Sequence, residues 1–273
     1  MEDLHYFPNR QRRNGQKKKT TASVYIRDHW KEDWFFGYQF LNGCNPVMIR
    51  KCSKIPDNFP VTDAMVQNSL GSSTLQQEVK DGKIFIVDFK MLDGLDANII
   101  NGEQQCLVAP ICLLHLDQGN RMMPLCLQLQ QTPGVHNPIF LPLDAELDWL
   151  LAKMWVKSAD FQCHSLISHL PNTHLVAETF CVATIRQLPS VHPIYKLLLP
   201  HAKYTMQINT QARQDLIGEG GVISKLLAVG TKGRLLLSQQ EFLAITYQLL
   251  CLPDALELRG VADLRVTTTR MMD

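Results

Sequence analysis

The sequence lacks both an excess of charge and a long apolar run. Its 27 lysines and arginines nearly balance 26 aspartates and glutamates, which leaves a net charge of +1. Because nucleic-acid binding depends on clustered positive charge, we expect no nucleic-acid partner. No apolar run approaches the roughly 18 residues that a bilayer span requires. With 45% apolar residues, the chain has the composition of an ordinary globular protein.

Ordered cysteine motifs and a signal peptide are also missing. The eight cysteines include no CxxC pair and follow no regular spacing, unlike a disulfide framework. The first residues lack the basic-then-apolar order of a signal peptide. We therefore expect reduced thiols within the core and a cytoplasmic protein.

Several common catalytic motifs are absent as well. The sequence has no HExxH, no GxSxG, no Walker loop and no GxGxxG, the signatures of helical zinc hydrolases, serine hydrolases and nucleotide-binding proteins. The glycine cluster at residues 218–221 fits the end of a helix better than a phosphate-binding loop. A zinc hydrolase is therefore the weakest of the metalloprotein interpretations.

Composition divides the chain into three parts. Residues 1–23 are basic without apolar periodicity, so we interpret them as a disordered lead-in. Residues 24–265 form the folded domain, and residues 266–273 are a short tail. Early in the domain, the aromatic residues between Trp30 and Gly43 indicate a packed segment with tight turns at its glycines.

The domain is predicted to be mainly α-helical with a small antiparallel sheet. Short apolar runs between Ile84 and Gln131, separated by Asp, Gly and Asn clusters, predict the sheet. After a proline-rich loop, Asp144 is placed to cap a long central helix that continues to Pro189. Further helices are expected at about 192–199, 203–217 and 238–250. The predicted buried stripe of the central helix comprises Leu147, Leu150, Leu151, Met154 and Trp155.

Three histidines recur at a spacing of five within this helix, at His164, His169 and His174, with Glu178 one turn later. On a regular α-helix, a spacing of five turns each ring by about 140° from the last, so two of them could not share a metal. A π-type turn would bring His169 and His174 onto one face. Imidazole suits iron, zinc, copper and nickel, and single buried histidines are often only hydrogen-bonded core residues. The spacing predicts an irregular helix and leaves the metal open.

The segment from His164 to Glu178 resembles the first iron signature of the lipoxygenase family. A second family signature follows from Val191 to His201, and the segments Trp30–Gly43 and Trp149–Lys153 are similar to family blocks. The resemblance covers about residues 28 to 262 and is nearer to the animal type than to the plant type. It implies a partial lipoxygenase catalytic domain whose central helix carries the histidines.

The resemblance also implies a reaction and a set of site residues. One non-haem iron, held in part by His169 and His174, would remove hydrogen from a polyunsaturated fatty acid, and dioxygen would add to give a lipid hydroperoxide. Peripheral membrane contact fits a lipid substrate. Arg213 or Lys203 could receive the substrate carboxylate. Five residues fall where the family lines its fatty-acid channel, although all also fit a plain helix core: Leu170, Leu175, Ile208, Ala212 and Leu216. The family carries alanine at the position of Ala212 where products tend toward S.

The sequence departs from the family pattern in three places. Ser165 stands where relatives carry Glu or Gln, and Pro171 lies between the two predicted ligands. In a regular helix this proline would press on the carbonyl of Ile167 and cost about 3 kcal/mol. The tail at residues 266–273 is aberrant, because threonines and then Met271-Met272-Asp273 stand where relatives continue with a tyrosine run, two aspartates and a glycine. The codons of those residues, read one base late, would give the residues seen here, so we interpret the tail as a frameshifted or alternatively spliced reading of the family sequence.

The sequence contains no counterpart of two further iron-binding side chains or of the C-terminal carboxylate ligand of the family. Two neutral imidazoles alone should hold iron weakly, because affinity depends on ligand number and geometry. Three functions therefore stay open: an iron dioxygenase, a hydroperoxide isomerase of the same family, and a non-catalytic fragment. The sequence does not predict the oligomeric state.

Overall fold

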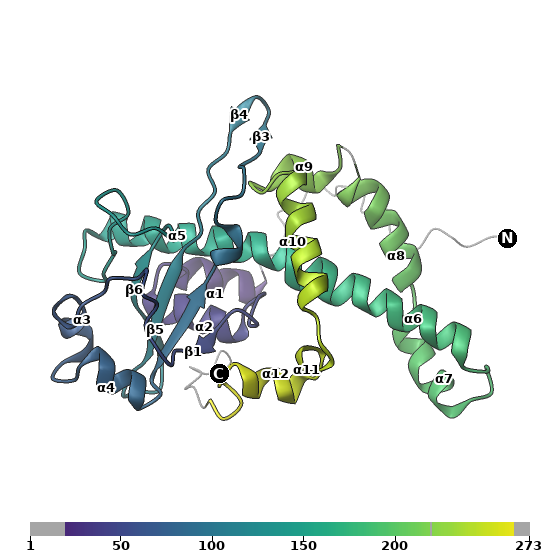
Figure 1. Cartoon of the computed structure of the whole chain (residues 1–273), viewed down its shortest axis with the longest axis horizontal. Coiled ribbons are helices and arrows are strands. Elements are labelled where there is room, and N and C mark those ends of the chain that lie inside the picture. The colour runs from purple at the N-terminus through teal and green to yellow at the C-terminus, as the bar shows by residue number, and fades with distance from the viewer. Residues whose placement is uncertain (1–19, 219, 265–273) are drawn as a thin grey trace.

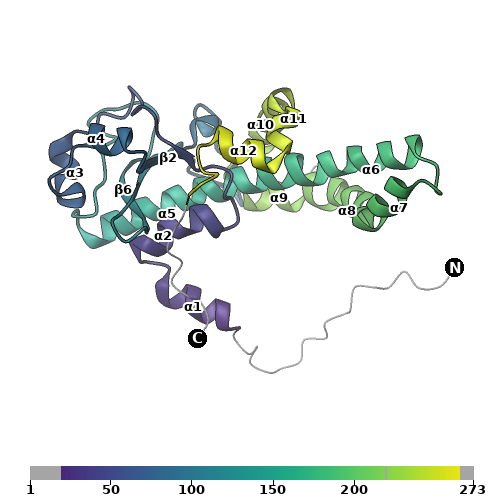
Figure 2. The ribbon, with the colours of Figure 1, turned by 90° about the horizontal axis from the view of Figure 1, so that it is seen from below.

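A continuous helical rod runs along the longest axis of the molecule. The computed structural model describes residues 20–218 and 220–264. The rod consists of α5 (Glu146–Cys163), the π-helix η2 (His164–Leu175) and α6 (Val176–Gln187), which follow one another without a break (Figure 1). At right angles to that view the rod is again unbroken (Figure 2). The predicted central helix that ends just before Pro189 is thus confirmed.

A small antiparallel sheet lies at one end of the rod. Its strands are β1 (Arg50–Lys51), β2 (Ile84–Asp88), β5 (Ile111–Leu116) and β6 (Met122–Gln128), in the order β1-β2-β5-β6. A separate hairpin pairs β3 (Ile99–Ile100) with β4 (Glu103–Gln104). These strands confirm the predicted small antiparallel sheet between Ile84 and Gln131.

The sheet has an apolar core on each of its two faces. Successive side chains of a strand point to opposite faces, and in β2 Phe85 and Val87 join one buried cluster while Ile84 and Ile86 join the other. The first cluster packs the sheet against α2 (Asp33–Asn42) and α5. The second includes Val66 of α3 (Asp63–Leu70) and Leu75 of α4 (Leu75–Lys80).

The remaining helices are α1 (Thr21–His29), η1 (Lys90–Leu92), α7 (Pro193–Leu198), η3 (Leu199–Ala202), α8 (Thr205–Ala212), η4 (Arg213–Ile217), α9 (Val222–Leu226), α10 (Thr231–Ala244), α11 (Tyr247–Leu250) and α12 (Leu252–Leu258). At the other end of the rod, α7 and α8 lie beside α6 (Figure 1). Near the middle of the rod, α10 crosses it beside η2, and after α12 the chain returns to the sheet, where the Arg259 carbonyl accepts from the Lys51 amide at 2.8 Å. Within the described residues, no helix combines the length and the apolar character needed to cross a membrane.

The prediction of tight turns between Trp30 and Gly43 was wrong in part. Most of this segment is the single helix α2, and Phe35, Phe36 and Phe40 are its buried aromatic residues. Gly37 lies within the helix against β6, where a methyl group in its place would overlap the carbonyl oxygen of Met122. The glycine therefore allows a close approach of helix and strand rather than a turn.

The predicted cap and buried stripe of the central helix were also wrong. Ala145 precedes the first turn of α5, and the Asp144 carboxylate instead accepts from the Leu141 amide at 2.8 Å. Leu147 and Leu151 are 75% and 53% exposed. Two apolar stripes run along α5, and periodicity alone does not tell which of them faces the core. The buried one comprises Trp149, Ala152, Val156, Ala159 and Cys163.

The later helices agree with prediction except for the last. The helices expected at about 192–199 and 203–217 correspond to α7 with the start of η3 and to α8 with η4. The helix expected at 238–250 begins earlier, at Thr231, and ends at Ala244, after which Ile245 has extended backbone. Residues 1–19 and 266–273 of the predicted lead-in and tail lie outside the described residues, while residues 21–23 already belong to α1.

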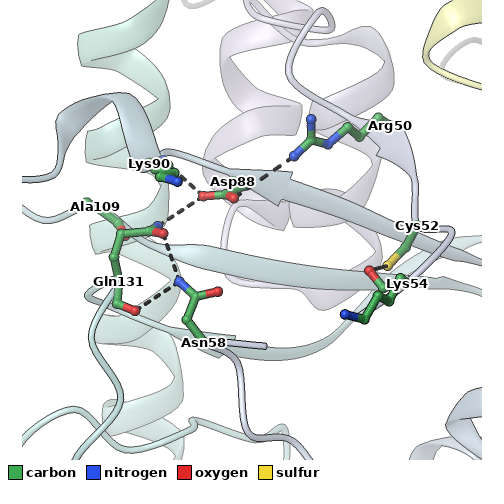
Figure 3. A network of polar contacts seen from close by, with 8 residues as sticks. All are labelled: Arg50, Cys52, Lys54, Asn58, Asp88, Lys90, Ala109 and Gln131. Carbon is green, nitrogen blue, oxygen red and sulfur yellow. Dashed lines mark hydrogen bonds and ion pairs between the residues drawn. The ribbon is translucent and has the colours of Figure 1, made fainter. Parts of the chain in front are cut away.

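Polar side chains fix the loops at one end of the central strands of the sheet (Figure 3). The Gln131 amide donates to the Asp88 carboxylate at 3.0 Å and to the Ala109 carbonyl at 2.9 Å. The Asn58 amide donates in turn to the Gln131 carbonyl at 2.9 Å. These bonds hold the predicted proline-rich loop against the ends of β2 and β5, apart from the histidines.

Candidate metal site

The histidines lie in a twelve-residue π-helix, η2. The irregular helix predicted from their spacing is therefore confirmed. Pro171 lies inside it and has no backbone N–H to donate, so a regular α-helical ladder would be interrupted here. The Thr173 hydroxyl donates to the Ser168 carbonyl at 2.9 Å, which adds a bond across the five-residue turn around the proline.

The π-helix brings the imidazoles of His169 and His174 together. Their Nε2 atoms lie 3.1 Å apart, and the ring planes are nearly perpendicular at 85°. Two nitrogens bound at about 2.1 Å to one metal and at right angles to each other would lie about 3.0 Å apart. Burial and the neighbouring rings of His174 and His164 lower the pKa of His169, which favours the neutral form that binds metal. The geometry of the pair fits two adjacent coordination positions of one metal ion.

Asn209 of α8 orients His174. The Oδ1 of Asn209 lies 2.9 Å from His174 Nδ1, while its Nδ2 donates to the His174 carbonyl at 2.8 Å. Since Nδ2 is the donor in that bond, Oδ1 is an acceptor and His174 carries its proton on Nδ1. Nε2 then keeps a lone pair toward His169, which is the usual arrangement of a metal-binding histidine. No sequence signal points to Asn209, because it comes from another helix 35 residues later.

Glu178 supports this arrangement by accepting hydrogen bonds from two side chains of the following helices. Its Oε2 accepts from Asn209 Nδ2 at 2.8 Å and from the Arg213 guanidinium at 2.6 Å. These hydrogen bonds, that of Arg213 first, lower the pKa of Glu178. One guanidinium nitrogen of Arg213 is thus paired within the protein, and the expectation that Arg213 or Lys203 receives a substrate carboxylate stays a prediction.

The third histidine of the row packs beside the pair. The His164 ring stacks on His169 with centroids 5.5 Å apart and planes at 18°, and its Nδ1 is buried without a hydrogen-bond partner. Over residues 20–218 and 220–264, no group of three or more His, Cys, Asp or Glu side chains is arranged to hold a metal. The described residues thus bring together two imidazole nitrogens, those of His169 and His174.

The predicted channel residues are only partly brought together. Leu170 is buried at 8% exposure. Leu175 lines a hollow together with Val182, Phe242 and the Glu178–Arg213 pair. On α8 and η4, the three other predicted residues follow at a spacing of four and share one helix face: Ile208, Ala212 and Leu216. Ile208 and Leu216 are 45% and 42% exposed, so the role of this face in substrate binding stays a prediction.

Comparison with known proteins places these features in a family. The lipoxygenase family model matches residues 10–271. The mouse arachidonate 12-lipoxygenase of 12R type is 48% identical over 247 residues, which cover 90% of this chain and 35% of the relative. Human polyunsaturated fatty acid lipoxygenase ALOX15B is 48% identical over 249 residues, with 90% and 37% covered. Mouse hydroperoxide isomerase ALOXE3 is also 48% identical, with 89% and 34% covered.

Solved structures give the same result. A calcium-dependent 11R-lipoxygenase superposes with a TM-score of 0.85 at 41% identity, over 90% of this chain and 37% of that one. A lipoxygenase crystallised with arachidonate superposes with a TM-score of 0.82 at 41% identity, over 88% and 36%. The chain therefore spans about a third of the length of the relatives that it matches. On sequence and on fold alike, it belongs to the lipoxygenase family.

Proposed function

We propose that this chain carries part of the iron site of a non-haem dioxygenase that converts polyunsaturated fatty acids into lipid hydroperoxides. The observation that carries the proposal is the 3.1 Å approach of His169 Nε2 and His174 Nε2 inside a π-helix. Relatives at 48% identity are named as arachidonate or polyunsaturated fatty acid lipoxygenases. Iron, when bound, would supply the one-electron chemistry that starts the reaction of the fatty acid with dioxygen.

The protein residues would hold and shield that metal. His169 and His174 would donate two nitrogens, and Asn209 would keep the Nδ1 proton of His174 away from the metal. The hollow beside Leu175 is apolar along one side, which suits a lipid chain. We further propose that Leu170, Ile208, Ala212 and Leu216 contribute to the same fatty-acid surface.

A metal analysis paired with an activity assay tests the proposal. The purified chain is loaded with ferrous iron without oxygen, desalted and analysed for iron, and the conjugated diene is followed by ultraviolet absorbance after arachidonate and oxygen are added. His169→Ala and His174→Ala should each abolish iron retention. His201→Ala, which removes an exposed histidine outside the pair, is the matched control and should retain it. Iron retained at the same level by all four proteins would exclude the two histidines as ligands.

Two other functions compete with dioxygenase activity. The relative named as a hydroperoxide isomerase is as similar as the others, at 48% identity, so consumption of a supplied fatty-acid hydroperoxide without diene formation would favour isomerase activity. A chain that retains no iron and changes neither substrate would be a non-catalytic fragment. This alternative stays open because, within the described residues, no third His, Cys, Asp or Glu side chain is grouped with His169 and His174.

We also propose a reducing, cytoplasmic setting with peripheral membrane contact during lipid uptake. All eight cysteines are free, but Cys44, Cys106 and Cys251 are exposed, so the expectation that the thiols lie within the core was wrong for these three. Among the five buried thiols, burial raises the pKa of Cys112 to about 12. A thiolate is needed for disulfide exchange, so such buried thiols stay inert. Fractionation of cells that express a tagged chain tests this proposal, and recovery in a secreted fraction would contradict it.

A further inference from the structure

The segment that follows α2 contacts the π-helix through one buried amide. Asn45 is 1% exposed, and the Ser168 hydroxyl donates to its Oδ1 at 2.8 Å. Ser168 directly precedes His169. We infer that Asn45 is a positioning residue, which sets the direction of the His169 imidazole by holding Ser168 in place. This inference rests on the proposed metal site.

A second contact fixes the orientation of the Asn45 amide. Its Nδ2 donates to the Asp160 carboxylate at 2.9 Å and to the Asp160 carbonyl at 3.3 Å. Because both acceptors are on the Nδ2 side, the oxygen of the amide must face Ser168. Asp160 is 3% exposed, with Lys157 Nζ 4.0 Å from its Oδ2. Asn45 therefore contacts the last turn of α5 on one side and the π-helix on the other.

This bridge spans the point where the hydrogen-bond pattern of the rod changes. Asp160 lies in the α-helix and Ser168 lies in the π-helix that begins at His164. A π-helix is rare and persists only where surrounding contacts favour it over an α-helix. A shift of one residue in this segment would turn His169 by about 100° about the helix axis. His169 would then point away from His174.

The two histidines are positioned by different parts of the chain. Asn209 from α8 bonds directly to His174, whereas the ring nitrogen contact of His169 is His174 itself, at 3.1 Å. The direction of His169 consequently depends on its backbone. Ser168 is the adjacent residue with a side-chain bond to a buried partner outside the rod. Asn45 therefore positions His169 indirectly, through Ser168, whereas Asn209 positions His174 by a direct hydrogen bond.

The test compares Ser168→Ala, Ser168→Thr and Asn45→Ala with the unchanged chain. Ser168→Ala removes the donor with little change in volume, and Ser168→Thr retains the hydroxyl. Asn58→Ala is the matched control, because it removes an amide with two bonds to Gln131 from the network at the sheet. Amide hydrogen exchange is measured across residues 168–176 and across β5. Co²⁺ affinity is measured by the visible absorbance of the protein-bound ion.

We expect Ser168→Ala and Asn45→Ala to speed exchange across residues 168–176 and to weaken Co²⁺ binding about tenfold, as loss of an outer-shell partner does in other metal sites. Ser168→Thr should keep the exchange rate and the Co²⁺ affinity of the unchanged chain, and Asn58→Ala should change neither quantity. Faster exchange with unchanged Co²⁺ affinity would make the bridge merely structural and overturn the inference, as would unchanged exchange in a folded Ser168→Ala protein. If the unchanged chain binds no Co²⁺, the proposed metal site fails on its own, and hydrogen exchange decides whether Asn45 holds the π-helix.

Discussion

The two ends of the helical rod bury their apolar residues to different extents. At the sheet end, Ile84, Phe85 and Leu114 are at most 1% exposed. At the helical end, which we define as residues 176–212, the buried residues are Cys181 and Asn209. Large apolar side chains there are open to solvent, such as Phe180 at 55% and Leu197 at 64%.

This difference indicates where the fold is most stable and how each histidine is held. Leu166 and Ile167 of η2 belong to the core cluster of the sheet end, whereas His174 faces the helical end and bonds to Asn209. Stability in a protein varies locally with buried apolar contacts. We therefore expect one side of the site to be held by core packing and the other by polar contacts, with the π-helix as the boundary.

The largest effect should come from a cavity in the sheet. Phe85→Ala removes a side chain that is 1% exposed, and such substitutions cost about 3 to 5 kcal/mol. Leu197→Ala at the helical end is the matched control, with a change expected below about 0.5 kcal/mol because Leu197 is exposed. Unfolding by urea is followed by tryptophan fluorescence, which reports the sheet end because all four tryptophans precede His164. Similar losses of unfolding free energy in both variants would contradict the difference in packing between the two ends.

An ion pair between buried Lys153 and half-buried Asp33 should give the next largest effect. Lys153 is 4% exposed, and its Nζ contacts Asp33 Oδ1 at 2.5 Å and the Lys31 carbonyl at 2.7 Å. Lys153→Met leaves the Asp33 carboxylate without this cation, which should cost about 3 kcal/mol in the same urea titration.

The double variant Lys153→Met with Asp33→Asn separates charge from packing. Removing both charges should recover part of the lost stability, because no unpaired charge then remains beneath α2. If the double variant were less stable than Lys153→Met alone, the uncompensated charge would not be the cause of the loss.

A carboxylate beneath the sheet should make stability depend on pH. Burial by itself raises the pKa of Glu78, but hydrogen bonds from Ser73 and His115 outweigh it and leave the pKa below its ordinary value of 4.5. The unfolded chain therefore takes up a proton more readily, and stability falls as the pH drops from about 4.5 through the folded pKa. Glu78→Gln should flatten this part of the stability curve, measured by urea unfolding, and an equal slope in both proteins would contradict the assignment. Glu103→Gln, on the exposed hairpin, is the control.

The local structure of this molecule could be predicted from its sequence better than its long-range contacts could. Two histidines at a spacing of five can share one metal only if the helix is widened between them, so the irregular helix could be predicted from the spacing of His169 and His174. The stripe of α5 that faces the core could not be predicted, because Leu147 and Trp149 both lie on apolar stripes. Only the position of α2 and the sheet determines which of the two is buried. Asn45 and Asn209 were missed for the same reason, since each meets the histidine segment across more than 30 residues of chain.

The smallest effect should come from the contact between α10 and the π-helix. Asn172 Nδ2 donates to Glu241 Oε1 at 2.6 Å, and Asn172 Oδ1 is buried without a partner. Glu241→Ala removes the acceptor and should cost about 1 kcal/mol, confined to the boundary between the two ends. Hydrogen exchange across residues 168–176 should then speed up while exchange in β5 is unchanged. In Glu241→Gln, which keeps an acceptor oxygen, the exchange rate across residues 168–176 should lie between those of the unchanged chain and Glu241→Ala. Faster exchange in β5 as well would mean that the π-helix and the sheet open together, so that the rod has no boundary at the histidines.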